Sequence, residues 1–161
     1  MGDNVRVAVR VRPFNSREKE RLATNIIFMR DGKTTAIMNP EDKKQRDFTF
    51  DFSYNSHVPR DDPAYASQDT VWRDIGVGVL ENAYAGYNCS LFAYGQTGSG
   101  KSYSMMGYGE DKGIIPIMCE RIFDRVRSNT DPDVTIRVEA SMLEIYMEKV
   151  KDLFNPHAGE L

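Results

Sequence analysis

One octapeptide, residues 95–102, constrains the fold of this 161-residue chain more than any other feature. It reads Gly-Gln-Thr-Gly-Ser-Gly-Lys-Ser and fits the pattern G-x-x-x-x-G-K-[ST]. The glycines allow the backbone to curl until consecutive N–H groups point inward at an anion, and the start of a following helix adds partial positive charge. Such a loop lies between a strand and a helix. The octapeptide therefore predicts an α/β fold with this loop at the end of a strand.

The residues before the octapeptide alternate between strand and helix patterns. Residues 5–12 place valine at every second position, which is typical of a strand with one aliphatic face. Residues 25–52 carry the pattern of a small β meander, with a hairpin turn signal at Asp31–Gly32. Over residues 67–84 the apolar spacing fits one face of a helix, and Gly86 lies where that helix is expected to stop.

The octapeptide itself is flanked by a predicted strand and a predicted helix. The apolar run 88–94 leads directly into the glycines and predicts a strand buried on both faces. Helical character resumes at Lys101, is interrupted over 107–113 and returns over 116–126. Alternating apolar residues over 134–142 predict a further strand. Interleaved strands and helices of this kind predict an α/β layered fold with a mixed central sheet.

Composition excludes several classes of protein. Hydrophobic residues make up 40% of the chain and charged residues 28%, which excludes a disordered tail and a membrane protein. No apolar run approaches the roughly 20 residues of a spanning helix, so direct membrane insertion is not expected. The net charge of −3 excludes wholesale binding to a nucleic acid polymer. The two cysteines, Cys89 and Cys119, are too few for a disulfide scaffold and indicate a reducing, cytoplasmic setting.

The octapeptide also predicts chemistry. Lys101 is placed to reach the β- and γ-phosphate oxygens of a nucleotide, and the Ser102 hydroxyl is placed to ligate Mg²⁺. The alternative is a glycine-rich turn that caps a helix and binds nothing. By itself the motif indicates a nucleoside triphosphate, and it does not separate a motor from a GTPase, a helicase or a small-molecule kinase.

A longer run around the octapeptide resembles a known family. Leu91–Gly107 resembles the phosphate loop of kinesin motor domains, and Val7–Phe14 resembles the first strand of that family. Phe14–Glu18 and the pair Ser102–Tyr103 resemble the kinesin-3 class of transport motors in particular. Further matching stretches follow the family's order: Gly86–Asn88, Gly113–Pro116, and Glu144–Tyr146 running on to Asp152–Pro156. The resemblance covers essentially the whole chain. It implies the P-loop NTPase fold of kinesin motors, a mixed central sheet flanked by helices, present only as its N-terminal half.

The resemblance assigns roles that spacing alone does not. Arg10 and Pro13 match residues that pack against the adenine of ATP, with Arg12 nearby, although strand alternation alone favours a wet surface for both arginines. A planar guanidinium stacks well on an aromatic ring. Tyr103 matches the aromatic residue on the other side of the base. The implied ligands are ATP and Mg²⁺, with Lys101 as the catalytic residue, Ser102 as the metal ligand and these nucleotide contacts: Arg10, Arg12, Pro13, Gly95, Gln96, Thr97, Gly98, Ser99, Gly100, Lys101, Ser102 and Tyr103.

Other polar residues are expected to be structural or solvated. Glu110, Asp111 and Lys112 lie in the interruption over 107–113 and are expected to face solvent. His57 and His157 lack the spacing of a metal site and are expected on the surface. Both cysteines are expected to be inert packing residues.

Residues 1–161 are expected to be the N-terminal part of a kinesin motor domain: the first strand, the meander lobe, the P-loop and the helix after it. The family's switch I motif N-x-x-S-S-R-S-H and switch II motif D-L-A-G-S-E do not occur in the sequence. Microtubule contacts are expected from the half outside this chain, and unpaired strand edges are expected within it.

The resemblance implies a cytoplasmic, cytoskeleton-associated ATPase. In the complete domain, microtubules would stimulate ATP hydrolysis, and hydrolysis would be coupled to movement along them. The alternative is a truncated nucleotide-binding or regulatory module without turnover. The cargo does not follow from the sequence.

Overall fold

The computed structural model describes residues 5–155 and residue 157. The chain divides into two compact units, Met1–Ile122 and Phe123–Leu161. The first unit carries the octapeptide, which is called the P-loop below. The second holds the end of one helix and a β hairpin.

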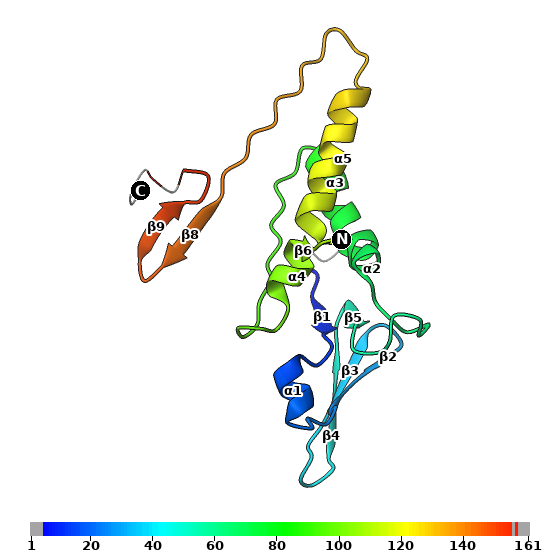
Figure 1. The fold of residues 1–161 in the computed structure, drawn as a ribbon. Helices are drawn as coiled ribbons and strands as arrows, with labels where there is room; N and C mark the ends of the chain where they lie inside the picture. Colours follow the sequence, from blue (N-terminus) through cyan, green and yellow to red (C-terminus); the bar gives the residue numbers. More distant parts are fainter. Residues whose placement is uncertain (1–4, 156, 158–161) are drawn as a thin grey trace. The chain divides into compact units, whose positions relative to one another are not determined.

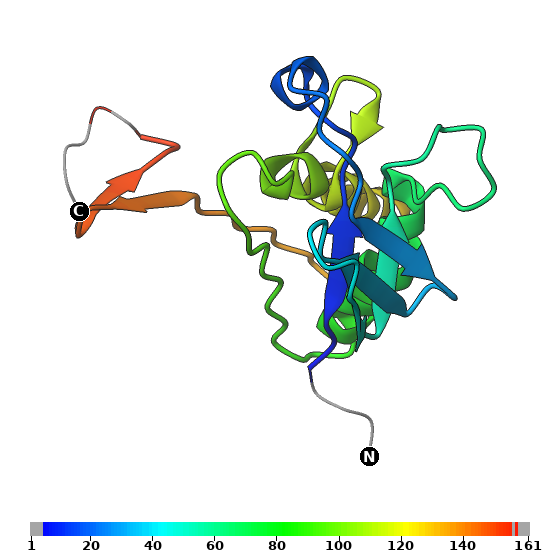
Figure 2. The ribbon, with the colours of Figure 1, turned by 90° about the horizontal axis from the view of Figure 1, so that it is seen from below.

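Two parallel strands run through the first unit. β1 (Ala8–Val11) pairs with β5 (Phe52–Asn55), with Ala8 opposite Phe52 and Val11 opposite Asn55. The two strands lie side by side in both views (Figures 1 and 2). The predicted strand over residues 5–12 is therefore confirmed over its central part. Arg10 lies in β1 and Arg12 directly follows it, and both side chains reach toward the P-loop region.

The predicted meander is confirmed as a three-stranded antiparallel sheet. Its strands are β2 (Ile27–Arg30), β3 (Thr34–Met38) and β4 (Gln45–Thr49), in that order across the sheet. Asp31 and Gly32 close the first hairpin with φ values of 49° and 70°. Asp31, Gly32 and Lys33 form the loop between the paired residues Arg30 and Thr34. Gly adopts a positive φ at no steric cost, and Asp tolerates it better than most residues.

The helix predicted over residues 67–84 is also confirmed, with a local change of winding. It consists of α2 (Gln68–Val71), a π-helical turn η1 (Trp72–Gly76) and α3 (Val77–Tyr84). Ser67 caps its start because the Ser67 side chain accepts a hydrogen bond from the Thr70 N–H. Gly86 follows the end of α3 with a φ of 88°, which suits the predicted stop.

The hydrophobic core of the first unit lies between β5 and the helices. Tyr54, Ala66, Val71 and Ile114 are each at most 5% exposed and form one cluster. Half-buried side chains pack against that cluster, among them Phe52, Trp72, Ile75, Leu91 and Met118. This core fixes the distance between β5, which lies beside β1, and the helices that follow the P-loop.

The strand predicted over residues 88–94 is wrong. These residues belong to no strand, and the ribbon there is drawn as a coil (Figure 2). Phe92 is 86% exposed and Tyr94 is fully exposed, while Cys89 is exposed rather than packed. A central strand needs backbone partners on both sides, and the described residues provide none here. The same holds for 134–142, where the predicted strand is also absent.

Short elements follow the P-loop. α4 (Lys101–Met105) is the predicted helix, and the predicted interruption is a tight hairpin of β6 (Gly107–Tyr108) and β7 (Asp111–Lys112). The helix predicted over 116–126 is α5 (Ile114–Ser128), and Cys119 on it is exposed.

Three remaining elements were not predicted as such. α1 (Ser16–Glu20) follows β1 directly, and the second unit pairs β8 (Leu143–Tyr146) with β9 (Lys149–Asp152). Pro156, at the end of the last matching stretch, lies outside the described residues. No helix within the described part of the chain is long and apolar enough to cross a membrane.

Candidate phosphate-binding site

The P-loop has the backbone shape that an anion cradle requires. Gly95, Gly98 and Gly100 have φ values of 145°, 78° and 100°, all in the region that side chains rarely adopt. A Cβ on Gly95 would lie 2.6 Å from Ser99 Oγ, so the loop closes only with glycine there. Gly100 is the N-cap residue of α4, whose first helical residue is Lys101.

Lys101 folds back over the loop that precedes it. Its Nζ donates to the carbonyl oxygens of Gly95, at 2.7 Å, and Gln96, at 2.9 Å. The ammonium therefore lies at the mouth of the loop with two neutral partners. A phosphate oxygen carries negative charge and offers a stronger, charge-assisted partner at this position.

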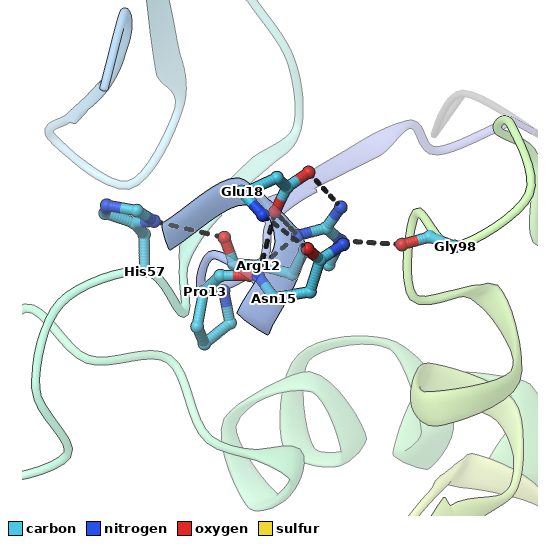
Figure 3. Close-up of polar contacts among 6 residues, drawn as sticks. All are labelled: Arg12, Pro13, Asn15, Glu18, His57 and Gly98. Carbon is cyan, nitrogen blue, oxygen red and sulfur yellow. Dashed lines mark hydrogen bonds and ion pairs between the residues drawn. The ribbon is translucent and has the colours of Figure 1, made fainter. Parts of the chain in front are cut away.

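Arg12 reaches the P-loop from the end of β1. Its Nε donates to the Gly98 carbonyl oxygen at 2.6 Å (Figure 3). Its other two nitrogens meet the Glu18 carboxylate at 2.6 and 2.7 Å, and Nη1 also donates to the Pro13 carbonyl at 2.7 Å. Pairing with Glu18 raises the pKa of Arg12, so the guanidinium remains charged. Arg12 is thus a contact of the loop backbone, and the role predicted for it beside the base remains untested.

Arg10, two residues before Arg12, is held by side chains from other parts of the first unit. Its Nε donates to Ser56 Oγ at 2.8 Å, and its Nη1 donates to Gln68 Oε1 at 2.7 Å and Ser104 Oγ at 3.1 Å. Its guanidinium carbon lies 5.2 Å from the centroid of the Tyr103 ring. Burial lowers the pKa of Arg10, although the group keeps its charge in proteins. Arg10 therefore joins β1 to α2 and α4.

Tyr103 lies between Arg10 and the β6–β7 hairpin. Its ring centroid is 5.9 Å from that of Tyr108, and burial raises the pKa of its phenol.

Asp111 does not simply face solvent as predicted, because its carboxylate forms a bidentate ion pair with Arg60 that includes a 3.0 Å hydrogen bond. The hydrogen bonds from Arg60 lower the pKa of Asp111. Lys112 likewise forms an ion pair with Glu120.

Several of the predicted site residues line one cavity of about 700 Å³ in the first unit. Arg10, Arg12 and Pro13 line it from β1, whereas Lys101 and Tyr103 line it from α4. The structure therefore brings the predicted base contacts to the same hollow as Ser99, Gly100 and Lys101 of the P-loop, whereas 95–98 and Ser102 do not line it. Gln96, Thr97 and Gly98 lie on the exposed part of the loop.

The residues present fit a nucleotide phosphate chain and one contact to its metal ion. The loop glycines leave room for the backbone N–H groups, and Lys101 adds a positive charge at the mouth. Ser102 lies exposed in the first turn of α4, where its hydroxyl can accept a metal ion. No group of three or more His, Cys, Asp or Glu side chains that could hold a metal is found among the described residues. Mg²⁺ usually keeps several waters and the phosphates as ligands, so a single serine is consistent with such a site.

Sequence reasoning missed Glu18 and Gln68, which hold the predicted site residues in place, and the ion pair of Arg60 with Asp111. Glu18 had a readable signal, because Asn15-x-x-Glu18 has the form of a capping box at a helix start. Gln68 bridges the Arg10 guanidinium and the Tyr103 carbonyl oxygen, which accepts at 2.6 Å. No sequence signal connects residues this far apart. His57 was expected on the surface but is half-buried, with its ring edge-on to Phe14.

Comparisons with known proteins match this arrangement. The sequence profile of the kinesin motor domain matches residues 10–160. Kinesin-related protein 1 of Dictyostelium discoideum is 52% identical over 96% of this chain, and Kinesin-like protein KIF1A of Rattus norvegicus is 52% identical over 96%. Kinesin-like protein unc-104 of Caenorhabditis elegans is 47% identical over 97%. The chain spans only 8%, 9% and 10% of these relatives, respectively.

Solved motor structures also align with the whole chain. A KIF14 motor with AMP-PNP, in complex with a microtubule, has a TM-score of 0.87 at 38% identity and covers all of this chain. A structure described as a fast kinesin has a TM-score of 0.80 at 31% identity. The chain covers 48% and 42% of those two structures, so it corresponds to about half of each. The predicted fold, a mixed α/β kinesin motor fold present in part, is confirmed, and the chain therefore belongs to the family of kinesin motor domains, of the kinesin-3 type.

Proposed function

We propose that residues 1–161 form the nucleotide-binding part of an ATP-dependent microtubule motor. The observation that carries the proposal is the P-loop, in which three positive-φ glycines curl the backbone beneath the Lys101 ammonium. AMP-PNP and ADP in the KIF14 structures support a nucleotide as the ligand. The microtubule in the same two structures supports the track as the partner.

In this proposal the residues act by binding and orientation. Lys101 exchanges the carbonyls of Gly95 and Gln96 for β- and γ-phosphate oxygens, and backbone N–H groups of the loop face the same anion. Ser102 supplies one oxygen to Mg²⁺, which when bound neutralises the phosphate charge. Pro13 and Tyr103 both line the hollow, and the proposal places the base between them.

Hydrolysis and movement belong to the longer protein in this proposal. Phosphoryl transfer needs groups that position water and stabilise charge around the γ-phosphate. The described residues provide the cradle for the phosphates, and the switch motifs that provide those groups in the family do not occur in the sequence. The second candidate function is a nucleotide-binding module without turnover.

The test measures binding and turnover in one series of variants. Mg-ADP binding is measured by fluorescence titration, and ATP turnover is measured with and without polymerised microtubules. Lys101→Ala removes a charge-assisted contact, so Kd for Mg-ADP should rise by about 10-fold or more. Lys33→Ala, which removes a charge from the exposed turn of the meander, is the matched control and should leave Kd unchanged.

Microtubule-stimulated turnover that Lys101→Ala abolishes establishes a motor ATPase. Mg-ADP binding without turnover in either condition establishes residues 1–161 as a nucleotide-binding part, as both candidate functions expect. Microtubule-stimulated turnover by the longer protein then separates the two functions. Equal Kd values for wild type and Lys101→Ala would overturn the assignment of the P-loop as the phosphate site.

A further inference from the structure

We propose that Arg12 and Glu18 form a clamp that orients the P-loop backbone, with Glu18 as a positioning residue for phosphate binding. This inference rests on the proposed nucleotide-binding function and assigns Glu18 a role at the same site. The clamp consists of two residues from different elements: Arg12 follows β1, and Glu18 lies in α1. Figure 3 shows the Arg12 guanidinium between the Glu18 carboxylate and the Gly98 carbonyl.

The first step is the orientation of one peptide group. The Gly98 carbonyl oxygen points outward and accepts from Arg12 Nε at 2.6 Å. A trans peptide directs its C=O and the following N–H to opposite sides, so the Ser99 N–H points into the loop. There it donates to the Gln96 carbonyl oxygen at 3.1 Å. Arg12 therefore holds the Gly98–Ser99 peptide with its donor on the side that faces an anion.

The second step explains why this peptide needs an external contact. Gly98 has a φ of 78°, and a Cβ placed on it would meet nothing within 4 Å. The loop itself therefore offers little packing to keep this peptide from turning. A glycine explores more of conformational space than any other residue. The charged donor at 2.6 Å thus adds, from outside the loop, to the Ser99–Gln96 hydrogen bond that restrains the same peptide from within.

The third step is the restraint on Arg12 itself. Two parallel hydrogen bonds from Nη1 and Nη2 to the Glu18 carboxylate fix the plane of the guanidinium. That plane also contains Nε, so the direction of the bond to Gly98 is set by Glu18. A lysine has a single charged nitrogen and cannot bind the carboxylate and the carbonyl in this fixed arrangement.

The fourth step is the restraint on Glu18. Its Oε2 accepts the Asn15 N–H at 2.8 Å, and the Asn15 side chain accepts the Glu18 N–H at 2.9 Å. This capping box fixes the start of α1 and the position of the carboxylate. Asn15 therefore supports the clamp through the helix, whereas Glu18 both caps the helix and touches Arg12.

The experiment is a double-mutant cycle read out as the Kd for Mg-ADP, measured on the full chain. The variants are Arg12→Ala, Glu18→Gln and their combination. Gln can still accept the hydrogen bond of the capping box but loses the charge that holds Arg12. We expect Glu18→Gln to raise Kd by about 5-fold or more, because a partly exposed, bidentate charged pair is lost. The combination should bind no more weakly than Arg12→Ala alone, because Glu18 acts through Arg12.

Three comparisons keep a merely structural role apart from the clamp. Asn15→Ala weakens the cap of α1 but leaves the pair of Arg12 and Glu18 in place, so it should change Kd less than Glu18→Gln. Glu20→Gln removes an exposed carboxylate from the same helix and should leave Kd unchanged. Arg12→Lys keeps the charge and should weaken binding nearly as much as Arg12→Ala. Circular dichroism of each variant measures the fold directly.

The outcomes distinguish the clamp from the proposed function. If wild type binds Mg-ADP more tightly than Lys101→Ala but Glu18→Gln binds as tightly as wild type, the clamp is wrong and the nucleotide site stands. Additive effects on Kd in the combined variant, or a wild-type Kd in Arg12→Lys, would also overturn the clamp. If wild type and Lys101→Ala bind equally weakly, the proposed function fails and the clamp fails with it.

Discussion

At the scale of single residues, the two arginines of β1 differ in what holds them. Arg10 is anchored by the side chains of Ser56, Gln68 and Ser104, and it joins elements within the fold. Arg12 is held by Glu18, and its Nε donates a hydrogen bond to the Gly98 carbonyl of the P-loop. Both were predicted from the resemblance to lie beside the base, and alternation alone favoured solvent. The structure gives both a network of protein partners, which neither line of reasoning contained.

The pairing of Glu18 predicts an acid-dependent loss of stability. Hydrogen bonds from Arg12 and from the Asn15 backbone hold the pKa of Glu18 at about 2, below its ordinary value of 4.5. A lowered pKa in the folded state stabilises the fold above pH 4.5, and this contribution is lost as the pH falls from about 4.5 to about 2. Wild type should therefore be more stable than Glu18→Gln at neutral pH and should lose that advantage in acid.

Chemical denaturation of wild type and Glu18→Gln at a series of pH values measures this difference. The free energies of unfolding should differ by a constant amount above pH 6 and converge toward pH 2. Glu20→Gln, which changes an exposed carboxylate of the same helix, is the control. A difference that persists unchanged to pH 2 would contradict the assigned pairing.

At the scale of elements, the helix of α2, η1 and α3 shows how one glycine decides local winding. A Cβ on Gly76 would lie 2.1 Å from the Trp72 ring, which packs against the hydrophobic core. The ring cannot move aside without opening that core. The π turn runs from Trp72 to Gly76, so the ring and the glycine lie at its two ends. π turns within α-helices generally require such a local reason.

The two neighbouring glycines of this helix give a matched pair of substitutions. Gly76→Ala should lower the free energy of unfolding by about 1–3 kcal/mol, because the added methyl overpacks the Trp72 ring. Gly78→Ala meets nothing within 4 Å and should raise stability by about 0.5–1 kcal/mol, because alanine loses less backbone freedom in a helix. Thermal unfolding followed by circular dichroism measures both. Equal changes in the two variants would contradict the contact.

At the scale of the whole molecule, the chain carries more exposed apolar surface than a complete domain requires. Phe92, Ile145 and Phe154 are 86%, 73% and 63% exposed, respectively. β1 and β5 each pair with only one other strand among the described residues. The chain also covers less than half of the solved motor structures that it matches. Exposed apolar patches and unpaired edges favour association between molecules.

This exposure predicts how the 161-residue chain behaves when it is purified alone. Sedimentation velocity should show association that increases with concentration, and the dye ANS should bind. Phe92→Ser should reduce both, because it removes the largest apolar side chain of the open segment over 88–94. Leu22→Ser is the control, because Leu22 is also 86% exposed but lies in the turn after α1. A monodisperse chain that binds no ANS would show that this surface does not drive association.

Local patterns were sufficient for much of the fold. The meander with its Asp31–Gly32 turn, the helix that ends before Gly86, and the helix after the P-loop all depend on residues close together in sequence. Turn chemistry and helical periodicity act over a few residues, so they can be read directly. The P-loop pattern likewise located the candidate phosphate site, since its shape depends on glycines within eight residues.

The predicted strand over 88–94 failed because a buried strand depends on partners from elsewhere. Its apolar side chains determined only that it should be covered, and the described residues leave Phe92 and Tyr94 exposed. Hydrogen bonding between strands is satisfied by neighbours that can come from any part of a chain. Apolar periodicity therefore indicates a buried segment without identifying what buries it.

The sequence by itself determined the meander, the helices before and after the P-loop, the glycine-rich loop itself and the family of the chain. Only the tertiary structure decided how the P-loop is supported. Arg12 meets Gly98 across 86 positions of sequence, and Arg10 meets Ser104 across 94. Contacts over such separations depend on how β1, α2 and α4 pack around one core. No local propensity encodes that packing, because it minimises exposed apolar surface and unpaired polar groups over the whole unit at once.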